Sequence, residues 1–578
     1  MRRGQEFDFV IAGGGTTALV AASRLVRDFD FSVLVIERGP ARTDPSLSRP
    51  SEYLPHLARG TFLEMHRSAA QEQLGGRAPI IPQAAALGGG SAVNAMVYIR
   101  GQPQDYNSWE QYVGPGSGWS YADMLPHFIA LERNGRLNDR YHGIEGPLGV
   151  SDPGHVSDAS LDFLLAAQGL GHSLNADFNG ERQAGVGLMQ LTTTREGGRL
   201  RRSDIVSALI EPLRRDKRLT IVTGARVDRI LIEGGRATGV EYRSGGKGEK
   251  RIVRASRDVL VAAGSYNTPK LLMLSGIGPA DQLADHGIAP LADLPGVGAN
   301  LQDHHEVPVV VAAKIKWGYF REDSGWRRRR NLFQYNAFGT GPASTTGIEA
   351  CLFYDPDGGD RPTVQLYCVP TVYLDRDVSS ARPTYGVTLN SCLLRPRARG
   401  SVRLASVDPA ARPIVDCNFF GHPDDLRLTI ASLRFARQLF DTEPMASKVA
   451  RELLPGEGVV ADERLAQHCA RTVKTNYHPV GTARMGPSHD PLAVLDARLR
   501  VRGIEGLRVI DCSAMPFLPS GNTHAPALAL ASRAADIIAE DHGEAAAPQA
   551  LPINMPAAKT SEPPNTTVTA ARQKGVSM

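Results

Sequence analysis

The pattern of apolar and polar positions near the start of the chain predicts a strand, a glycine-rich turn and a helix. Residues 7–12 (FDFVIA) are mostly apolar and partly β-branched, which is typical of a strand buried in a parallel sheet. After three glycines, Ala, Leu and Val recur at helical spacing. Residues 31–37 (FSVLVIE) form a second apolar run that ends in an acid. This order indicates a βαβ unit.

Similar elements recur in the middle and at the end of the chain. Residues 218–243 alternate like antiparallel strands around a hairpin at Gly234–Gly235. Residues 257–278 predict a strand, a glycine turn and a helix, and residues 506–541 predict a strand, a Pro/Gly-rich loop and a long helix. The stretch 306–477 differs, because strands such as VQLYCVP carry few such turns.

We therefore expect an α/β protein (α+β overall) with a discontinuous, Rossmann-type cofactor domain and an inserted substrate domain. The cofactor domain comprises residues 1–150, 190–305 and 478–541, and the substrate domain comprises residues 151–189 and 306–477. Two separate Rossmann domains are the weaker alternative, because the last strand–helix element is too short to stand alone. Residues 542–578 are rich in Ala, Pro and Thr, hold no aromatic residue, and are expected to be a disordered tail.

Composition excludes several classes of protein. The 578 residues carry a net charge of +4, too small an excess to indicate nucleic-acid binding. Six scattered cysteines form no CxxC pair, and no apolar run approaches the roughly 18–20 residues that span a bilayer. We expect a cytoplasmic protein. The basic run Arg327–Arg330 is interpreted as a solvated helix face or loop, and peripheral anion or membrane contact stays open.

The first glycine loop carries the chemistry of a dinucleotide site. Gly13, Gly15 and Ala18 fit G-x-G-x-x-G/A, which allows a tight turn, close backbone approach to a pyrophosphate, and close packing of helix on strand. The helix N-terminus adds unpaired N–H groups. Glu37 ends the second strand, where an acid binds a ribose hydroxyl, so the residues predict FAD or NAD.

A second glycine-rich stretch, Leu87–Gly101 (LGGGSAVNAMVYIRG), favours the larger cofactor. Three glycines, a serine and an asparagine suit backbone that runs against a flat, polar molecule. A single NAD site rarely needs two such loops, whereas an extended cofactor with its own ring system does.

With these motifs the chain resembles the glucose–methanol–choline (GMC) family of flavin oxidoreductases. The resemblance rests on GGGTTA with Glu37, GGGSAVNAMVYIRG, GSYNTPKLLMLSGIGP, LPGVGANLQDH, NYHPVGTARMG and IDCSAMPFLPSGNTHAPALALA, which together span residues 9–541. The segment CLLRPRARGSVRLASVDP is similar to the branch of choline dehydrogenase-like alcohol dehydrogenases. The resemblance implies a p-hydroxybenzoate-hydroxylase-like cofactor fold and a six-stranded antiparallel sheet in the substrate domain.

The resemblance also implies a set of FAD-binding residues. They are Gly13, Gly15, Thr16, Thr17, Glu37, Arg38, Gly88, Gly89, Ser91, Asn94, Ala95, Val97, Val227, Gly264, Tyr477, Asp511, Cys512, Asn522 and Thr523. Val93 stands where some relatives attach FAD through a histidine, so FAD is expected to be non-covalent. The segment IPQAAALGGGS lacks the basic residue that the family usually has before this loop.

Oxidation of an alcohol by a flavin needs a base for the hydroxyl proton and a hydride acceptor. His478 matches the family's catalytic histidine, and Asn522 matches the position that orients the alcohol oxygen. Asn522 also suits a helix cap before Pro526, and His524 is a rival base of lower rank. His304 and His305 are assigned to a turn between domains, and no metal site is predicted.

The predicted function is oxidation of a primary alcohol to an aldehyde, with hydride transfer to flavin N5 and with O₂ or an electron carrier as acceptor. A GMC-type lyase, a photodecarboxylase and a non-catalytic flavoprotein are the alternatives; photodecarboxylases have a cysteine where this chain has Leu394. Choline would need aromatic and acidic groups around its cation; Tyr477 adjoins the base, and Tyr335, Phe338 and Tyr367 are further candidates, although no spacing places them together. A monomer and a homodimer both stay open.

Overall fold

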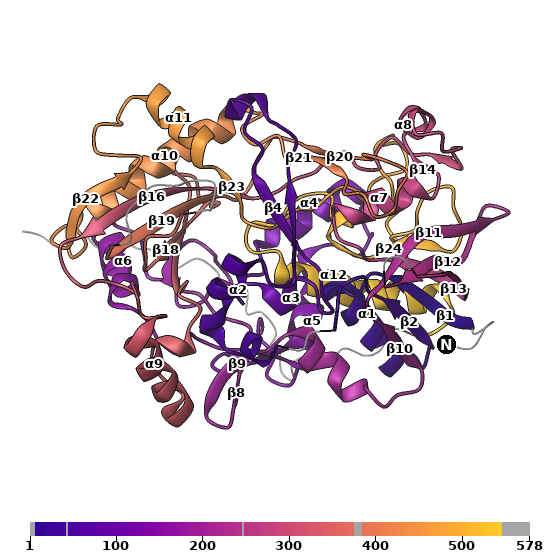
Figure 1. The fold of residues 1–578 in the computed structure, drawn as a ribbon, viewed down its shortest axis with the longest axis horizontal. Coiled ribbons are helices and arrows are strands. Elements are labelled where there is room, and N and C mark those ends of the chain that lie inside the picture. The colour runs from indigo at the N-terminus through magenta and orange to yellow at the C-terminus, as the bar shows by residue number, and fades with distance from the viewer. Residues whose placement is uncertain (1–5, 42–43, 246–247, 375–383, 546–578) are drawn as a thin grey trace, which may run out of the picture.

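A computed structural model describes residues 6–41, 44–245, 248–374 and 384–545 of the chain. Within these residues two seven-stranded sheets stand side by side, each covered by helices (Figure 1). This arrangement confirms the predicted α/β architecture. The tail predicted to be disordered lies, from residue 546 onward, outside the described residues.

The first sheet is built from the predicted nucleotide-type elements. Its order is β10-β2-β1-β13-β12-β11, with β24 beside β13. The strands are β1 (Glu6–Ala12), β2 (Val33–Ile36), β10 (Leu219–Val222), β11 (Ala225–Glu233), β12 (Arg236–Ser244), β13 (Lys250–Val261) and β24 (Leu507–Val509). β10, β2, β1, β13 and β24 are parallel, whereas β11 and β12 pair antiparallel around Gly234–Gly235, as predicted.

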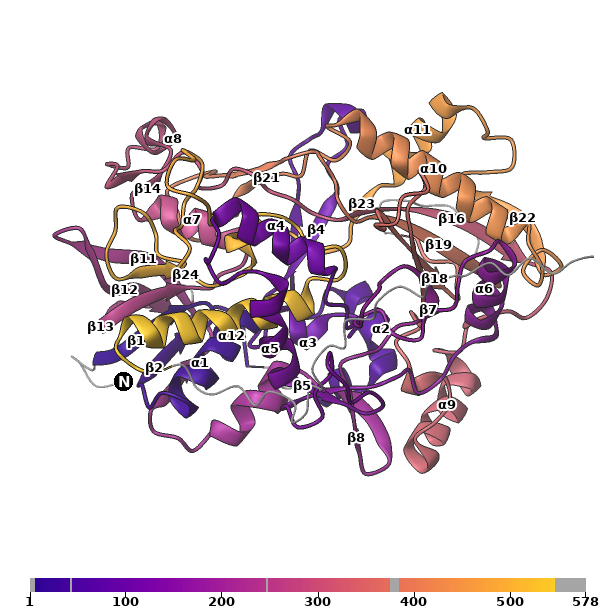
Figure 2. The same ribbon diagram turned by 180° about the vertical axis from the view of Figure 1, so that it is seen from behind.

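Two helices from opposite ends of the chain pack on this sheet. Helix α1 (Thr16–Arg27) lies against α12 (His524–Asp541), and both are buried along most of their length (Figure 2). Their small side chains, such as Ala21 and Ala531, let the two backbones approach closely. The pairing brings the first glycine loop next to the segment that precedes α12.

The second sheet is antiparallel at every strand pair, in the order β22-β16-β19-β18-β17-β7. These six strands are β7 (Gly185–Leu188), β16 (His305–Ala313), β17 (Ala350–Tyr354), β18 (Val364–Val369), β19 (Gly386–Leu393) and β22 (Val449–Leu454). They match the six-stranded sheet that the resemblance implied. A seventh, two-residue strand, β23 (Lys474–Thr475), pairs antiparallel with the first two residues of β16.

Helices α6 (Asp158–Gly169), α10 (Pro423–Phe440) and α11 (Asp462–Thr472) cover the second sheet (Figure 1). β7 and α6 come from residues 151–189, so both segments assigned to the substrate domain contribute to this layer. The exact domain limits stay a prediction.

Between the two sheets lies the stretch that carries the second glycine loop. Short helix α3 (Gly90–Val93) begins in this loop, and α2 (Tyr53–Arg59) lies near it. Helices α4 (Pro103–Val113) and α5 (Tyr121–Leu131) follow α3 in the chain. A separate apolar cluster, which includes Met189, Val369 and Tyr367, fills the space beside α2.

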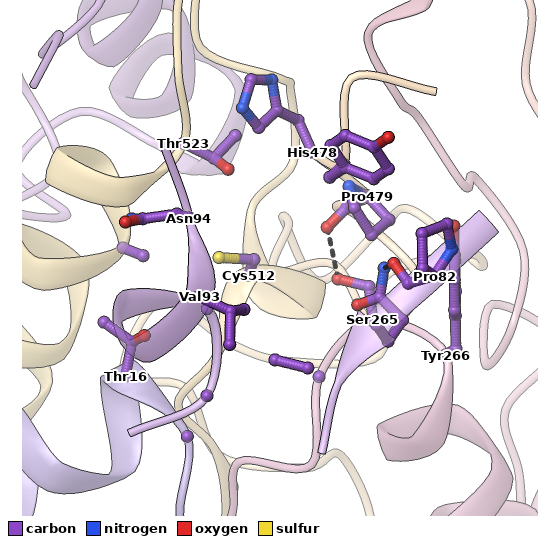
Figure 3. A pocket seen from close by; sticks show the side chains of 18 of the residues that line it. Thr16, Pro82, Val93, Asn94, Ser265, Tyr266, His478, Pro479, Cys512 and Thr523 are labelled. Carbon is purple, nitrogen blue, oxygen red and sulfur yellow. Dashed lines mark hydrogen bonds between the residues drawn. The ribbon is translucent and has the colours of Figure 1, made fainter. Parts of the chain in front are cut away.

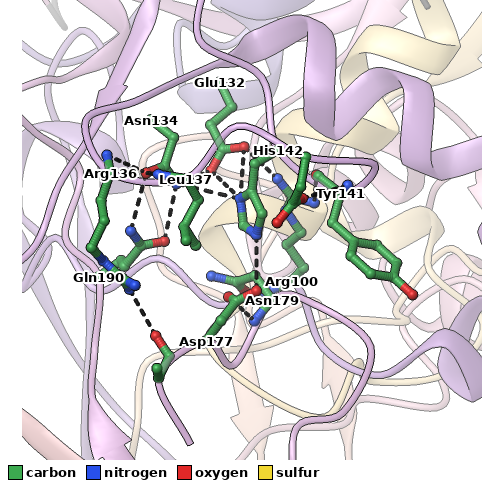
Figure 4. Close-up of polar contacts among 12 residues, drawn as sticks. Arg100, Glu132, Asn134, Arg136, Leu137, Tyr141, His142, Asp177, Asn179 and Gln190 are labelled. Carbon is green, nitrogen blue, oxygen red and sulfur yellow. Dashed lines mark hydrogen bonds and ion pairs between the residues drawn. The ribbon is translucent and has the colours of Figure 1, made fainter. Parts of the chain in front are cut away.

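A buried polar cluster fixes the end of the second glycine stretch. The Arg100 guanidinium donates to Glu132, and its backbone N–H donates to Asn179 (Figure 4). His142 stands between Glu132 and Asp177, with nitrogen–oxygen distances of 3.2 and 3.0 Å. The two carboxylates thus face Arg100 and an imidazole whose pKa is raised by hydrogen bonds to them. Because the partners belong to different segments between residues 100 and 179, the cluster holds the loop on the rest of the chain.

Two predictions about charged segments have different outcomes. Arg327–Arg330 lies in α9 (Gly325–Phe338), where its arginines are mostly exposed, so the solvated helix face is confirmed. The turn assigned to His305 is wrong, since His305 begins β16, whereas His304 lies in the irregular segment just before that strand; both imidazoles are buried. Among the described residues no helix combines the length and apolar character needed to cross a membrane.

Candidate active site

A cavity of about 370 Å³ lies between the two sheets and is lined by residues from both (Figure 3). The residues predicted from the sequence that line it are Gly13, Gly15, Thr16, Thr17, Glu37, Arg38, Gly89, Asn94, Ala95, Val97, Val227, Gly264, Tyr477, His478, Asp511, Cys512, Asn522 and Thr523. Val93 and Cys512 lie between Thr16 and His478 in the same view. Gly88 and Ser91 do not line the cavity.

The first glycine loop closes one end of the cavity. Gly13 adopts φ +111°, and a Cβ on it would lie 2.3 Å from the carbonyl oxygen of Ala262, so only glycine fits. Gly15 caps α1 without any side-chain hydrogen bond, which leaves the N–H groups of the first turn available to an anion. The Glu37 carboxylate accepts from the N–H groups of Gly14 and Gly39, at 2.7 and 2.6 Å, and burial raises its pKa.

The two glycine loops are in direct contact. A Cβ on Gly89 would lie 2.8 Å from Cα of Gly15. Thr16 Oγ1 donates to the carbonyl of Gly88 at 3.0 Å, and the Ser91 hydroxyl donates to the same carbonyl at 2.7 Å. Gly88 and Ser91 therefore hold the loops together from behind the cavity, which explains why neither residue lines it.

A buried arginine supports the second loop. The Arg202 guanidinium donates to Asn94 Oδ1 at 2.8 Å and to the Ser91 carbonyl at 3.2 Å. The segment before the loop contains no basic residue, and β9 (Arg199–Arg202) supplies one instead. Nothing in the sequence around Arg202 points to this contact across more than 100 residues.

The C-terminal segment approaches the cavity through Asp511. One carboxylate oxygen of Asp511 accepts from the Gly264 N–H at 2.8 Å and from the Thr268 hydroxyl at 2.6 Å. Gly264 begins the turn before α7 (Asn267–Leu274). Asp511 thus joins the segment after β24 to the turn between β13 and α7. Cys512 beside it is a free, partly exposed thiol in the cavity wall.

His478 lies at the far end of the cavity on a loop held by two anchors. Its backbone N–H donates to Asp303 Oδ1 at 2.9 Å, while Asp303 Oδ2 accepts from the Thr475 hydroxyl at 2.6 Å. The Ser265 hydroxyl donates to the Pro479 carbonyl at 2.6 Å (Figure 3). Burial raises the pKa of Asp303 to about 7.

A second histidine determines the protonation of His478. His304 Nε2 lies 3.0 Å from the Leu394 carbonyl, which can only accept, so this nitrogen carries the proton. Burial lowers the pKa of His304 to about 4, so its ring is neutral and Nδ1 is an acceptor. His478 Nδ1 lies 2.9 Å away and must therefore donate. The Nε2 of neutral His478 is therefore unprotonated and can act as a base.

Asn522 stands in front of that base. Its Nδ2 lies 3.4 Å from His478 Nε2, and its Oδ1 lies 3.5 Å from the amide nitrogen of Gln365 in β18. The prediction that Asn522 caps α12 is wrong, since Thr523 is the cap residue and the helix has no side-chain cap. The amide is thus available to the cavity.

The environment of His478 keeps it neutral. Its pKa lies well below 6.5, mainly because the ring is buried and secondly because His304 is close by. The rival base His524 also lines the cavity, and burial lowers its pKa to about 4. Its electrostatic neighbours are Arg202 and Asp204, behind the second glycine loop. Of the two histidines, the one at position 478 is paired with an amide that can hold an oxygen.

Three residues of this site were missed from the sequence: His304, Gln365 and Arg202. His304 is itself the histidine of the motif LPGVGANLQDH, and this motif was the available signal. Gln365 is one polar residue in an otherwise apolar strand, and a polar side chain inside a buried strand is a usable signal in retrospect.

Comparisons with known proteins agree with this geometry. The chain is 36% identical over 540 residues to an oxygen-dependent choline dehydrogenase of Rhizobium etli (strain CIAT 652) and 37% identical over 537 residues to an alcohol dehydrogenase [acceptor] of Pseudomonas putida. Each match covers 92% of this chain and 95% of the relative. The solved structure of pyridoxine 4-oxidase from Mesorbium loti superposes with a TM-score of 0.82 at 31% identity, covering 92% of this chain and 98% of that one.

The family assignment rests on both halves of the chain. The model of the N-terminal part of the GMC oxidoreductases matches residues 7–306, and the model of their C-terminal part matches residues 396–531. These matches include both glycine loops, His304, His478 and Asn522. The resemblance stated from the motifs is confirmed, and the chain belongs to the GMC oxidoreductase family.

Proposed function

We propose that this protein binds FAD non-covalently and oxidises an alcohol, with His478 as the base. The observation that carries the proposal is the unprotonated Nε2 of His478, which faces the Asn522 amide in a cavity that begins at the N-terminus of α1. FAD supplies the acceptor for the hydride that leaves the alcohol carbon.

The residues present fit FAD. A pyrophosphate suits the uncapped first turn of α1, and a ribose suits the carboxylate of Glu37. The cavity continues from the first glycine loop past the second to His478, so a molecule that fills it contacts both loops. Val93 points into it and has no nucleophilic atom, which supports non-covalent binding (Figure 3).

The chain's own residues handle the proton and the oxygen. His478 Nε2 takes the hydroxyl proton, which breaks the O–H bond as the C=O bond forms. Asn522 Nδ2 donates to the oxygen while negative charge develops on it. His304 and Asp303 keep the imidazole in one orientation and one tautomer, so the base is in place before the alcohol enters.

The names of the relatives support a small alcohol as substrate. They are a choline dehydrogenase, an alcohol dehydrogenase [acceptor] and a pyridoxine 4-oxidase, and both choline and pyridoxine carry a CH₂OH group. We propose a primary alcohol, with O₂ or an electron carrier as final acceptor.

The test is anaerobic mixing of the purified protein with a panel of primary alcohols while the flavin absorbance near 450 nm is followed. Bleaching with aldehyde formation supports the proposal. Carbonyl formation with an unchanged flavin spectrum would instead indicate a lyase, and light-dependent loss of CO₂ from an acid would indicate a photodecarboxylase. Absence of any turnover with FAD bound would indicate a non-catalytic flavoprotein.

A further inference from the structure

One wall of the cavity has the composition of a cation-binding cage. Glu306 and three tyrosines, Tyr53, Tyr367 and Tyr373, line the part of the cavity formed by the second sheet and α2. Aromatic faces around a carboxylate are the arrangement that binds ammonium groups. Of the candidates considered from the sequence, Tyr367 takes part, and Tyr477 lines the same cavity. Tyr335 donates to the Leu200 carbonyl instead, and Phe338 is exposed on α9.

The cation in this cage is the chain's own Lys474. Lys474 and Glu306 are directly paired neighbours on β23 and β16, and Lys474 Nζ lies 2.8 Å from Glu306 Oε1. The same ammonium lies 4.0 Å from the centre of the Tyr373 ring. Lys474 is 5% exposed and Glu306 is 1% exposed, so the pair is buried.

The second oxygen of Glu306 is also occupied. Tyr367 donates its hydroxyl to Glu306 Oε2. The pKa of Tyr367 is raised well above 10, mainly by burial and secondly by the charge of Glu306. The tyrosine therefore stays protonated and remains a donor. The carboxylate is therefore neutralised by Lys474 and held by Tyr367 without any contribution from a ligand.

The side chains beside the cage are apolar. Leu54, Leu57, Met189, Ile348 and Val369 line the same part of the cavity. A cation entering here would lose its water and meet Lys474, which has the same charge. An uncharged hydrocarbon group would bury apolar surface against these residues at no such cost.

We propose that Lys474 occupies the position of a substrate cation and so restricts this enzyme to uncharged alcohols with an apolar body, excluding quaternary ammonium alcohols such as choline. The inference rests on the proposed oxidation of an alcohol, and it adds a substrate class that differs from the choline named for the choline dehydrogenase relatives. Lys474 acts as a repulsive element, a common basis of specificity.

The test compares choline with 3,3-dimethylbutan-1-ol, which has the same shape but carries carbon in place of the charged nitrogen. Binding of each compound to the FAD-loaded protein is measured by calorimetry, and turnover is measured by flavin reduction. We expect the wild type to prefer the uncharged compound by about a hundredfold in Kd or kcat/KM, since like charges at close range cost several kcal/mol.

Substitution of the lysine should shift this preference. Lys474→Met leaves Glu306 as an unpaired carboxylate in the aromatic cage, so choline affinity should rise at least about tenfold relative to the uncharged compound. Glu306→Gln in the same background should abolish that gain. Lys448→Met is the matched control, because Lys448 likewise pairs with a carboxylate, Asp162, and lies over an aromatic ring, Trp317, but Asp162, unlike Glu306, does not line the cavity. It should keep the wild-type preference.

The outcomes separate this inference from the proposed function. If the wild type binds choline as well as the uncharged compound, or binds neither, the inference is overturned. If 3,3-dimethylbutan-1-ol binds preferentially but reduces no flavin, the inference stands and the proposed function fails. Because the wild type alone can decide, a Lys474→Met protein that does not fold would leave the test intact, with Lys474→Gln as the second variant.

Discussion

The Nδ1 atoms of His304 and His478 lie 2.9 Å apart, and this contact determines which nitrogen of His478 is a base. The Leu394 carbonyl holds the proton of His304 on Nε2, so the contact obliges His478 to carry its own proton on Nδ1. A histidine with the opposite tautomer would present an N–H to the alcohol and could not accept its proton.

Removal of the hydrogen-bond acceptor at His304 should therefore impair catalysis without loss of bound FAD. We expect His304→Leu to lower the rate of flavin reduction about 10²-fold or more, whereas His304→Asn, whose side-chain oxygen can replace Nδ1 as the acceptor, should retain most of the rate. Stopped-flow absorbance of the two FAD-loaded variants is the measurement.

The control for this pair is His468→Leu. His468 is equally buried, donates to the Pro308 carbonyl at 2.9 Å, and lies outside the cavity lining. Its loss should affect stability but not the rate of flavin reduction. Equal rates in His304→Leu and His304→Asn would show that the acceptor at position 304 does not set the tautomer.

Asn522 should contribute through its amide. We expect Asn522→Ala to lower kcat about 10²-fold, because a donor to the developing negative charge is lost, while FAD content stays near that of the wild type. Asn331→Ala is a suitable control, since Asn331 is a buried amide on α9, away from the cavity. An unchanged kcat in Asn522→Ala would remove this residue from the reaction.

The cofactor should be released by denaturation. Val93 offers no atom for a covalent bond, so precipitation of the protein with acid should leave all the yellow colour in the supernatant. Absorbance of the supernatant and the pellet decides the question. Flavin retained in the pellet would mean that another side chain of the cavity is attached to it.

The polar cluster around His142 should give the protein a pH-dependent stability. Burial acts to lower the pKa of His142, but hydrogen bonds to Asp177 and Glu132 outweigh it, and the pKa is raised above 6.5 (Figure 4). A raised pKa means that the stabilisation is complete below about pH 6.5. It is then lost as the pH rises through the folded-state value.

We expect His142→Asn to destabilise the protein by about 3 kcal/mol at pH 6, since it breaks a buried ion pair, and by less at pH 9. Thermal unfolding of both proteins at several pH values is the measurement. A difference in Tm that grows between pH 6 and pH 9 would contradict the assignment.

Local patterns in the sequence predicted much of the fold and part of the site. The glycine loops, the strands around them and the Gly234–Gly235 hairpin follow from periodicity and turn chemistry, and the structure places them as expected. The positions of His478 and Asn522 came from the family motifs, because no local pattern links residues 44 positions apart.

Contacts across the sheets could not be predicted in this way. His304 and Lys474 each act through a partner far away in the sequence or on a neighbouring strand, and strand register decides those pairs. A single residue of slip would turn Glu306 away from the cavity. Arg202 was missed for the same reason, since its role depends on where β9 lies relative to the second glycine loop.

The central claim is that neutral His478 takes the alcohol proton, and the rate of anaerobic flavin reduction as a function of pH tests it most directly. Burial and His304 lower the pKa of His478, and a base is active above its pKa, so the wild-type rate should stay level down to pH 6.5 and fall only below it. His478→Ala with equal FAD content should be slower by about 10²–10⁴-fold and should lose this acid limb. A His478→Ala protein that is reduced at the wild-type rate, with the same pH profile, would contradict the account.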